Sequence, residues 1–204
     1  MNNRIIILGS SGIISKNLQF KLKKEKFNFL VFGKKEINLK KKNSYRILRK
    51  KIKNNDVIIF ISAEAPVKNF EMFHNNMNIC SNVCKALIGK KISKIIYISS
   101  DAVYSDIKKK LQESSETKPV SIHGLMHLSR ELQLQSLFGE ILCILRPTLI
   151  YGQGDTHEGY GPNKFFKLAK KNKNIVLFGK GEELRDHIHI SDIINDYDII
   201  KFCF

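Results

Sequence analysis

The feature that most limits how this chain can fold is a glycine-containing turn close to its first residue. An apolar run, Ile5-Ile-Ile-Leu8, leads directly into Gly9, and Gly12 follows just before a helical segment. Glycine lets the backbone turn sharply and approach another group closely. The free N–H groups at the start of a helix can bind an anion. The order strand, turn, helix therefore predicts a phosphate-binding loop, with Gly9, Ser11, Gly12 and Ile13 as its candidate contacts.

The following residues alternate between apolar, β-branched runs and helical segments. Strands are predicted at 4–8, 29–32, 56–62, 94–99 and 141–145, and helices at 14–24, 45–53, 77–88 and 124–138. Such alternation is typical of a parallel sheet with helices on both faces. The sequence therefore predicts an α/β protein with a doubly wound parallel sheet of the Rossmann type.

The character of the sequence changes after Tyr151. Several glycines and Pro162 make residues 152–162 irregular, and a helix over 163–171 and a short strand over 175–178 are predicted to follow. We expect a dinucleotide-binding Rossmann domain over residues 1–150 and a small, truncated substrate-binding part over residues 151–204.

Composition is that of a globular protein. Hydrophobic residues make up 43% of the chain and charged residues 26%. No apolar run approaches the roughly 20 residues that a membrane span needs. The first residues do not have the layout of a signal peptide. We therefore expect a cytoplasmic protein with no membrane partner.

The net charge of +16, from 35 basic and 19 acidic residues, raises the question of a polyanionic partner. It would suit nucleic-acid binding. The lysines, however, are spread along the chain, and their densest runs, at 21–26, 40–42, 49–53 and 108–110, lack interleaved aromatic residues that could stack on bases. We interpret these runs as solvated helix faces in preference to a nucleic-acid site, although the charge could still attract a phosphate-bearing ligand.

The cysteines at positions 80, 84, 143 and 203 form no CxxC pair and no Cys/His cluster with zinc spacing. Cys80 and Cys84 are four residues apart, so they share one face of the predicted helix. The pattern predicts buried free thiols and no metal site.

The end of the second strand selects the cofactor in dinucleotide-binding sheets. An acidic residue there accepts a hydrogen bond from the ribose, whereas a basic residue favours the extra phosphate of NADP. Here the strand ends at Gly33 and is followed by Lys34 and Lys35, while Glu36 comes three residues after Gly33. This order favours NADP over NAD, with Lys34 as the candidate contact.

Four segments carry a more specific pattern. Residues 94–104 form a strand that ends in Ser-Ser-Asp-Ala-Val-Tyr, and residues 145–152 read Leu-Arg-Pro-Thr-Leu-Ile-Tyr-Gly. Residues 178–192 contain Gly-Lys-Gly and then Arg-Asp-His-Ile-His, and residues 56–63 form a strand that begins with Asp-Val. In this order the segments resemble the NAD(P)-dependent sugar-nucleotide epimerase/dehydratase family, a branch of the extended short-chain dehydrogenases.

The resemblance implies roles for individual residues. Ser100 would hydrogen-bond the sugar oxygen that reacts, and Asp101 falls where dTDP-sugar dehydratases and reductases have an Asp. Ala102 replaces the Glu of the dehydratases, so reduction or epimerisation is favoured over dehydration. Arg185 would hold the diphosphate of the substrate, and Tyr104 would be a second substrate contact.

The resemblance also implies cofactor contacts. The family's loop reads GxxGxxG, and its third glycine is Ser15 here, which is small enough to keep the helix close to the strand. The residues implied to lie along the cofactor ribose and nicotinamide are Ser62, Ala63, Pro147, Thr148 and Leu149.

One departure concerns the catalytic helix. The family has a Tyr and, four residues later, a Lys, and this chain has His123 and His127 in their places. The Tyr acts as acid/base, and the Lys lowers its pKa and holds the nicotinamide ribose. Histidine can act as acid/base because its ordinary pKa is about 6.5, and the spacing puts both rings on one helical face. The pair is thus the candidate catalytic pair, while metal binding by it lacks an evident third ligand.

Two functions remain open at this point. The first is an epimerase or reductase of nucleotide-linked sugars, in surface-polysaccharide or related biosynthesis, possessing a homodimer interface on the helices near 77–88 and 124–138. The second is a catalytically impaired or truncated relative that binds only a dinucleotide or a nucleotide sugar.

Overall fold

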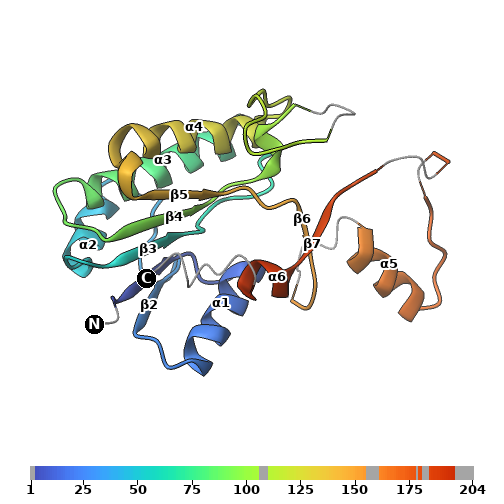
Figure 1. Cartoon of the computed structure of the whole chain (residues 1–204), viewed down its shortest axis with the longest axis horizontal. Helices are drawn as coiled ribbons and strands as arrows, with labels where there is room; N and C mark the ends of the chain where they lie inside the picture. The colour runs from blue at the N-terminus through green and yellow to red at the C-terminus, as the bar shows by residue number, and fades with distance from the viewer. Residues whose placement is uncertain (1–2, 106–109, 155–160, 178, 181–183, 196–204) are drawn as a thin grey trace.

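The structure is a computed structural model that describes residues 3–105, 110–154, 161–177, 179–180 and 184–195 (Figure 1). Its centre is a five-stranded sheet with the strand order β2-β1-β3-β4-β5. The strands are β1 (Ile5–Leu8), β2 (Phe29–Phe32), β3 (Val57–Phe60), β4 (Lys94–Ile98) and β5 (Leu142–Leu145). All neighbouring strands in this sheet are parallel.

Helices cover both faces of the sheet, which confirms the predicted doubly wound fold. On one face, α1 (Ile13–Lys24) and α6 (Ile190–Asn195) pack on Ile5 and Ile7. On the other face, the alternate residues of β1 pack in a core with α2 (Ser44–Lys51), α3 (Phe70–Leu87) and α4 (Ile122–Phe138). Figure 1 shows these two layers on opposite sides of the sheet. Burial on both faces explains why β1 and β3 are continuous apolar runs without polar alternation.

Two helices begin earlier than the apolar pattern predicted. Helix α3 starts at Phe70 because the Asn69 side chain accepts a hydrogen bond from the Met72 N–H at 2.9 Å. Helix α4 starts at Ile122, after Ser121 Oγ, which accepts from the Gly124 N–H at 3.1 Å. Such capping satisfies donors that have no partner within the helix. The early start of α4 places His123 in its first turn.

The candidate residues follow the carboxyl ends of the parallel strands, so they lie at one edge of the sheet. Gly9 N–H donates to Phe32 O, Ser62 N–H donates to Leu8 O and Ser99 N–H donates to Leu145 O. Strand β1 lies between β2 and β3 in the sheet. The connection after β1 therefore leads to one side of β1, and the connection after β3 leads away on the other side. Open α/β sheets bind ligands at the carboxyl ends of the strands beside such a reversal.

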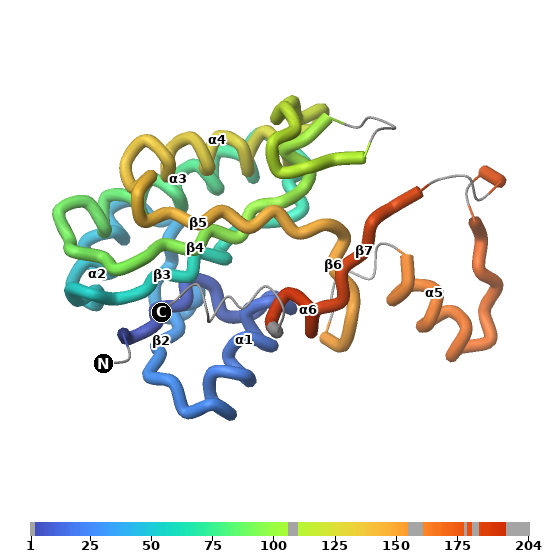
Figure 2. Tube along the Cα trace, viewed as in Figure 1, coloured from blue at the N-terminus to red at the C-terminus, as the bar shows by residue number. Residues whose placement is uncertain are grey.

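The residues after Leu149 form a smaller unit. Strands β6 (Leu149–Tyr151) and β7 (His187–His189) pair in parallel, and α5 (Gly161–Lys170) lies away from the large sheet (Figure 2). The predicted strand over 175–178 is wrong for residues 175–177, which are exposed and form no strand. Phe178 lies outside the described residues. An apolar run becomes a strand only where a neighbouring strand completes its backbone hydrogen bonds.

Helix α6 returns to the Rossmann core. Ile190, Ile193 and Ile194 are buried together with Leu18 of α1, and Lys21 Nζ donates to Ile194 O at 3.0 Å. Part of the predicted substrate region therefore packs on the first domain, and the division at residue 150 stays a prediction. Within the described part of the chain, no helix is long and apolar enough to cross a membrane.

Candidate functional site

The loop after β1 has the shape of a phosphate cradle. Gly9 has φ +115°, and a Cβ on it would lie 3.0 Å from the Ser62 nitrogen, so β3 approaches the loop closely. Ser15 fits in the place of the third glycine because its buried Oγ donates to Gly9 O at 2.6 Å. Helix α1 begins after Gly12 with no side-chain cap and no acidic residue in its first turn. Its first N–H groups can therefore receive a pyrophosphate.

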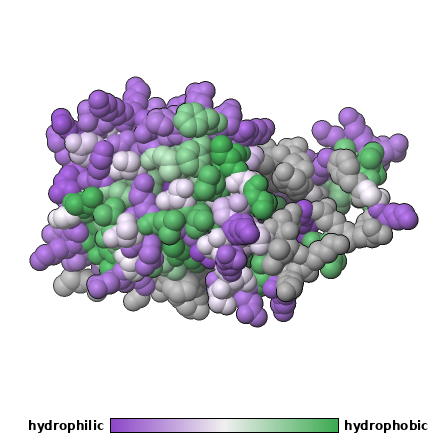
Figure 3. Space-filling view, turned by 90° about the horizontal axis from the view of Figure 1, so that it is seen from above, coloured by the Kyte–Doolittle hydropathy of each residue, from purple (hydrophilic) through white to green (hydrophobic). Residues whose placement is uncertain are grey.

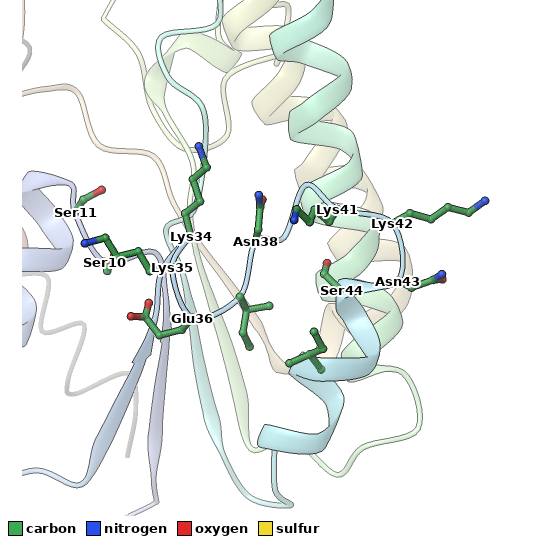
Figure 4. Close-up of a pocket in the computed structure, with 12 residues that line it drawn as sticks. Ser10, Ser11, Lys34, Lys35, Glu36, Asn38, Lys41, Lys42, Asn43 and Ser44 are labelled. Atoms are coloured by element: carbon green, nitrogen blue, oxygen red, sulfur yellow. The ribbon is translucent and has the colours of Figure 1, made fainter.

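A cavity of about 880 Å³ continues from this loop toward α2 (Figure 4). Its lining residues are Ser10, Ser11, Lys34, Lys35, Glu36, Ile37, Asn38, Lys41, Lys42, Asn43, Ser44 and Ile47. The cavity lies at the end of β2, where the adenosine half of a dinucleotide binds in such folds. The residues present therefore fit a dinucleotide.

At the end of β2, the side chain of Glu36 lies close to the strand although Glu36 comes several residues after the strand in the sequence. Gly33 is buried, and its N–H donates to Glu36 Oε2 at 2.9 Å. The chain turns back at this point, so the carboxylate of Glu36 lies beside the strand end. Lysines, including the predicted Lys34, line the same cavity.

The end of β4 carries the predicted reactive turn. Ser100 Oγ donates to Asp101 Oδ1 at 3.1 Å and accepts from the Ala102 N–H at 3.2 Å. The Asp101 N–H donates to Pro147 O at 3.2 Å, which joins the turn to the segment after β5. Burial raises the pKa of Asp101, and the positive charge of Arg185 opposes this shift.

Helix α4 starts directly against this turn. A Cβ on Gly124 would lie 1.9 Å from Ala102 O, so position 124 has no room for a side chain. This contact brings His123 to the same region as Ser100. The helix and the turn are thus fixed to each other by packing of backbone on backbone.

The structure brings the two candidate histidines together. The His123 and His127 rings lie edge to face with centroids 4.8 Å apart. His123 Nδ1 accepts a long hydrogen bond of 3.4 Å from the Val67 N–H. His127 is buried, and its Nδ1 lies 2.8 Å from the hydroxyl of Tyr97.

Both rings are held in the neutral form. Burial lowers the pKa of His123. Burial, together with the neighbouring His123 and Arg130, lowers the pKa of His127 to about 3. Burial also raises the pKa of Tyr97, so its hydroxyl keeps its proton and can donate to His127.

These contacts define what His123 can do chemically. Since its Nδ1 accepts from a backbone N–H, the neutral ring carries its proton on Nε2. Nε2 can then donate a hydrogen bond to a substrate oxygen. To accept a proton there, the ring must first move its proton to Nδ1 and lose the bond to Val67. A neutral imidazole used as a hydrogen-bond donor can polarise a carbonyl.

Arg130 is a residue near the site that the sequence interpretation missed. It is fully buried, and its guanidinium donates to Ser62 O at 3.0 Å and to Asn76 Oδ1 at 2.8 Å. It also lies over the ring of Phe60. Arg130 comes three residues after His127, and this spacing, which puts both side chains on one helical face, could have identified it as a residue of the site. Arg130 places a positive charge next to His127.

A second network holds the ends of β4 and β5 together. Arg146 donates to both carboxylate oxygens of Glu131, at 3.0 and 2.7 Å, and Ser99 Oγ donates to the same carboxylate at 2.5 Å. Arg146 also donates to the hydroxyl of Tyr104, which in turn donates to Glu113 O. The hydroxyl of Tyr104 is thus engaged within the protein, and its role as a substrate contact stays a prediction.

The last predicted site residues lie around β6 and β7. Arg185 is exposed just before β7, and its charge acts on Asp101. His189 Nδ1 lies 2.6 Å from Ser191 Oγ, and its ring contacts Tyr151. His187 Nδ1 lies 3.2 Å from Arg185 O. The two histidines are therefore packing and hydrogen-bonding groups.

The remaining predicted cofactor contacts follow the strand ends. Ser62 and Ala63 come after β3, Pro147 and Thr148 come after β5, and Leu149 begins β6; all are half-buried. Among the described residues, no group of three or more His, Cys, Asp or Glu side chains could hold a metal ion.

This architecture defines a dinucleotide-binding protein of the Rossmann class: a doubly wound parallel sheet, a glycine loop after β1 and polar side chains at the carboxyl edge. Residues 5–200 match the sequence model of the NAD dependent epimerase/dehydratase family. The chain belongs to this family.

Relatives of known name agree with this assignment. The chain is 26% identical to the uncharacterized UDP-glucose epimerase YtcB of Bacillus subtilis, over 94% of this chain and 70% of that protein. It is 20% identical to human dTDP-D-glucose 4,6-dehydratase, over 95% of this chain and 64% of that protein. The chain thus spans about two thirds of the length of these relatives.

Solved structures share the fold. UDP-glucose 4-epimerase from Thermotoga maritima, with UDP-glucose, superposes with a TM-score of 0.79 at 17% identity, over 94% of this chain and 71% of that one. UDP-glucuronic acid 4-epimerase from Bacillus cereus, in complex with NAD, gives 0.77 at 22% identity, over 94% and 70%.

Proposed function

We propose that this chain is an NAD(P)-dependent epimerase or reductase that acts on a nucleotide-linked sugar. The observation that carries the proposal is the junction of the Ser100 turn with His123, at the edge that also bears the glycine loop. The names of the relatives support a nucleotide-sugar substrate. The cytoplasmic location and the role in surface-polysaccharide or related biosynthesis, both expected from the sequence, are part of this proposal.

The cofactor would lie along the carboxyl edge of the sheet. Its pyrophosphate would be held by Gly9, Ser11, Gly12 and Ile13, and its nicotinamide half would be surrounded by Ser62, Ala63, Pro147, Thr148 and Leu149. When bound, the nicotinamide takes or gives a hydride at a ring carbon of the sugar. The lysines of the adenosine cavity, at positions 34, 35, 41 and 42, support the predicted preference for NADP.

The protein side chains would act on the reacting oxygen. Ser100 Oγ and the Nε2–H of His123 would both donate to it, which stabilises negative charge that develops when a keto group is reduced. The sequence predicted His123 as acid and base, and its hydrogen bond to Val67 supports the donor role. Reduction is therefore the direction that this geometry favours, in keeping with Ala102.

Other residues would position the substrate and the cofactor. Arg185 would hold the diphosphate, since a guanidinium fork suits phosphate oxygens. Ser100 donates its hydroxyl proton to Asp101 at 3.1 Å in the free protein, and it would exchange this bond for one to the reacting oxygen when substrate binds. His127, with its Nδ1 taken by Tyr97, would donate from Nε2 to the nicotinamide ribose.

The proposed assembly is a homodimer formed by α3 and α4. Leu125 and Leu132 of α4 are exposed, at 47% and 63%, and Phe70 at the start of α3 is exposed at 76%. The face above α3 and α4 shows apolar surface between hydrophilic margins (Figure 3). A second copy would cover this surface.

Substitution of Ser100 tests the catalytic proposal. Ser100→Ala removes one donor to the reacting oxygen, and loss of such a donor costs about 100-fold or more in turnover. NADH and NADPH fluorescence titrations should give unchanged cofactor affinity. Turnover is measured with a panel of UDP- and dTDP-linked sugars and their keto forms. Equal turnover by the variant and the wild type would remove Ser100 from the mechanism.

The alternative function is a relative that binds a dinucleotide or a nucleotide sugar without chemistry. Burial of both histidines favours it, because burial disfavours the imidazolium cation that either ring would become on accepting a proton from a sugar hydroxyl. The two functions differ in one result. Cofactor and nucleotide-sugar binding without turnover of any sugar in the panel would establish the alternative.

A further inference from the structure

We propose that Glu36 replaces the acidic residue that β2 lacks at its end, and that it sets the balance between NAD and NADP. The inference rests on the proposed dinucleotide cofactor and deepens it, because it names the side chain that reads the adenosine ribose.

The space at the end of β2 explains why the acid cannot be at position 33. A Cβ on Gly33 would lie 2.0 Å from Ser10 Oγ, so a side chain there would displace Ser10 of the phosphate loop. The same Cβ would lie 3.2 Å from Glu36 Oε2. The carboxylate of Glu36 therefore occupies the space into which a side chain at position 33 would grow.

A closed turn holds Glu36 in this place. The Gly33 N–H donates to Glu36 Oε2 at 2.9 Å, and the Ile37 N–H donates to Gly33 O at 2.9 Å. Ile37 and Leu39 are buried, at 4% and 5% exposure, and they anchor the turn in the core. Figure 4 shows Glu36 beside Ser10, on the side of the cavity that faces the phosphate loop. The carboxylate is positioned by the backbone before any ligand binds.

The lysines of the cavity oppose this carboxylate. A carboxylate accepts hydrogen bonds from the two hydroxyls of an unmodified ribose and repels a 2′-phosphate. The lysines at 34, 35, 41 and 42 attract that phosphate. Glu36 and the lysines are all exposed, so salt screens both, but Glu36 is also held in place by its hydrogen bond to the Gly33 N–H. Cofactor preference is then a balance in which Glu36 favours NAD and the lysines favour NADP.

Glu36→Gln is the direct test, because glutamine has the same size and its amide oxygen can keep the bond to Gly33. The dissociation constants of NADH and NADPH are measured by nicotinamide fluorescence for wild type and variant. We expect the NADPH-over-NADH affinity ratio to rise about tenfold, the value of one hydrogen bond to a charged group. Lys41→Met with Lys42→Met should lower the same ratio and leave NADH affinity nearly unchanged.

Glu25→Gln is the matched control. Glu25 is a glutamate at the far end of α1 from the phosphate loop. Its substitution should leave the ratio unchanged. If both cofactors bind wild type and Glu36→Gln leaves the ratio within twofold, the role of Glu36 is overturned while the proposed function stands. If neither cofactor binds wild type, the proposed function and this inference both fail.

Discussion

At the scale of single residues, the proposed site depends on which ring nitrogens carry protons. His123 and His127, which the sequence analysis predicts to replace the family's Tyr and Lys, are both neutral because burial lowers their pKa values. The hydrogen bonds to Val67 and Tyr97 then decide which nitrogen carries the proton. Under the proposed function, Arg130 would supply the positive charge near the cofactor ribose, because its charge acts on His127.

The low pKa of His127 predicts a dependence of stability on pH. The pKa of His127 in the folded chain, about 3, is below the ordinary value of 6.5. Between these two values the unfolded chain binds a proton on His127 that the folded chain does not bind. This contribution to stability is complete above about pH 6.5 and is lost as the pH falls, at about 1.4 kcal/mol per pH unit.

The measurement is urea unfolding at pH 7.5, 6.5 and 5.5. His127→Gln keeps an acceptor for Tyr97 and does not titrate, so its free energy of unfolding should fall less steeply below pH 6.5 than that of wild type. His74→Gln, at an exposed position of α3, should behave like wild type. Identical slopes for wild type and His127→Gln would show that His127 is not held neutral by the fold.

At the scale of elements, the site depends on how α4 is joined to the ends of β4 and β5. The first turn of α4 is pressed on Ala102 through Gly124, and its middle is tied to β5 through Glu131 and Arg146. The side chain of Glu131 is 4% exposed and that of Arg146 is 23% exposed. Removal of one partner from a buried ion pair leaves an uncompensated charge.

Glu131→Gln should therefore lower the free energy of unfolding by about 3 kcal/mol. Arg146→Met made in the Glu131→Gln background should cost much less than Arg146→Met alone, because the partner charge is already absent. Chemical denaturation of the three variants and wild type completes the cycle. Additive effects of the two substitutions would show that the ion pair contributes nothing to holding α4 on the sheet.

At the scale of the whole molecule, the fold leaves apolar side chains exposed on α3 and α4. Leu125, Leu128 and Leu132 recur along one face of α4, with Leu128 half-buried and the other two exposed. The α1 and α6 face of the sheet is closed differently, by the return of α6 to α1. The partner in the proposed homodimer would therefore cover the α3 and α4 side of the molecule.

We predict that the wild-type protein is a dimer and that Leu132→Glu makes it a monomer, since two buried carboxylates would face each other across the interface. Sedimentation velocity over a range of concentrations measures the state, and circular dichroism checks the fold. Phe166→Glu, at an exposed apolar position of α5, is the control and should remain dimeric. A wild-type monomer at every concentration would contradict the proposed interface.

The sequence by itself determined the sheet and the phosphate loop. A strand made of a continuous apolar run is buried on both faces only when helices cover both sides of the sheet. The five central strands were therefore predictable within a few residues. Gly9 with its positive φ, and the spacing of His123 and His127, are local properties that sequence order reveals.

The tertiary structure decided the features that join distant segments. The apolar run at 175–177 forms no strand, while the short strands β6 and β7 pair although they are far apart in the chain. The proton position on His123 depends on Val67, and the burial of Arg130 depends on Asn76 and Ser62. Glu36 stands three residues beyond the strand in the sequence, yet a turn anchored in the core returns it to Gly33. Hydrogen bonding and burial depend on neighbours in space, and those neighbours exist only once the chain has folded.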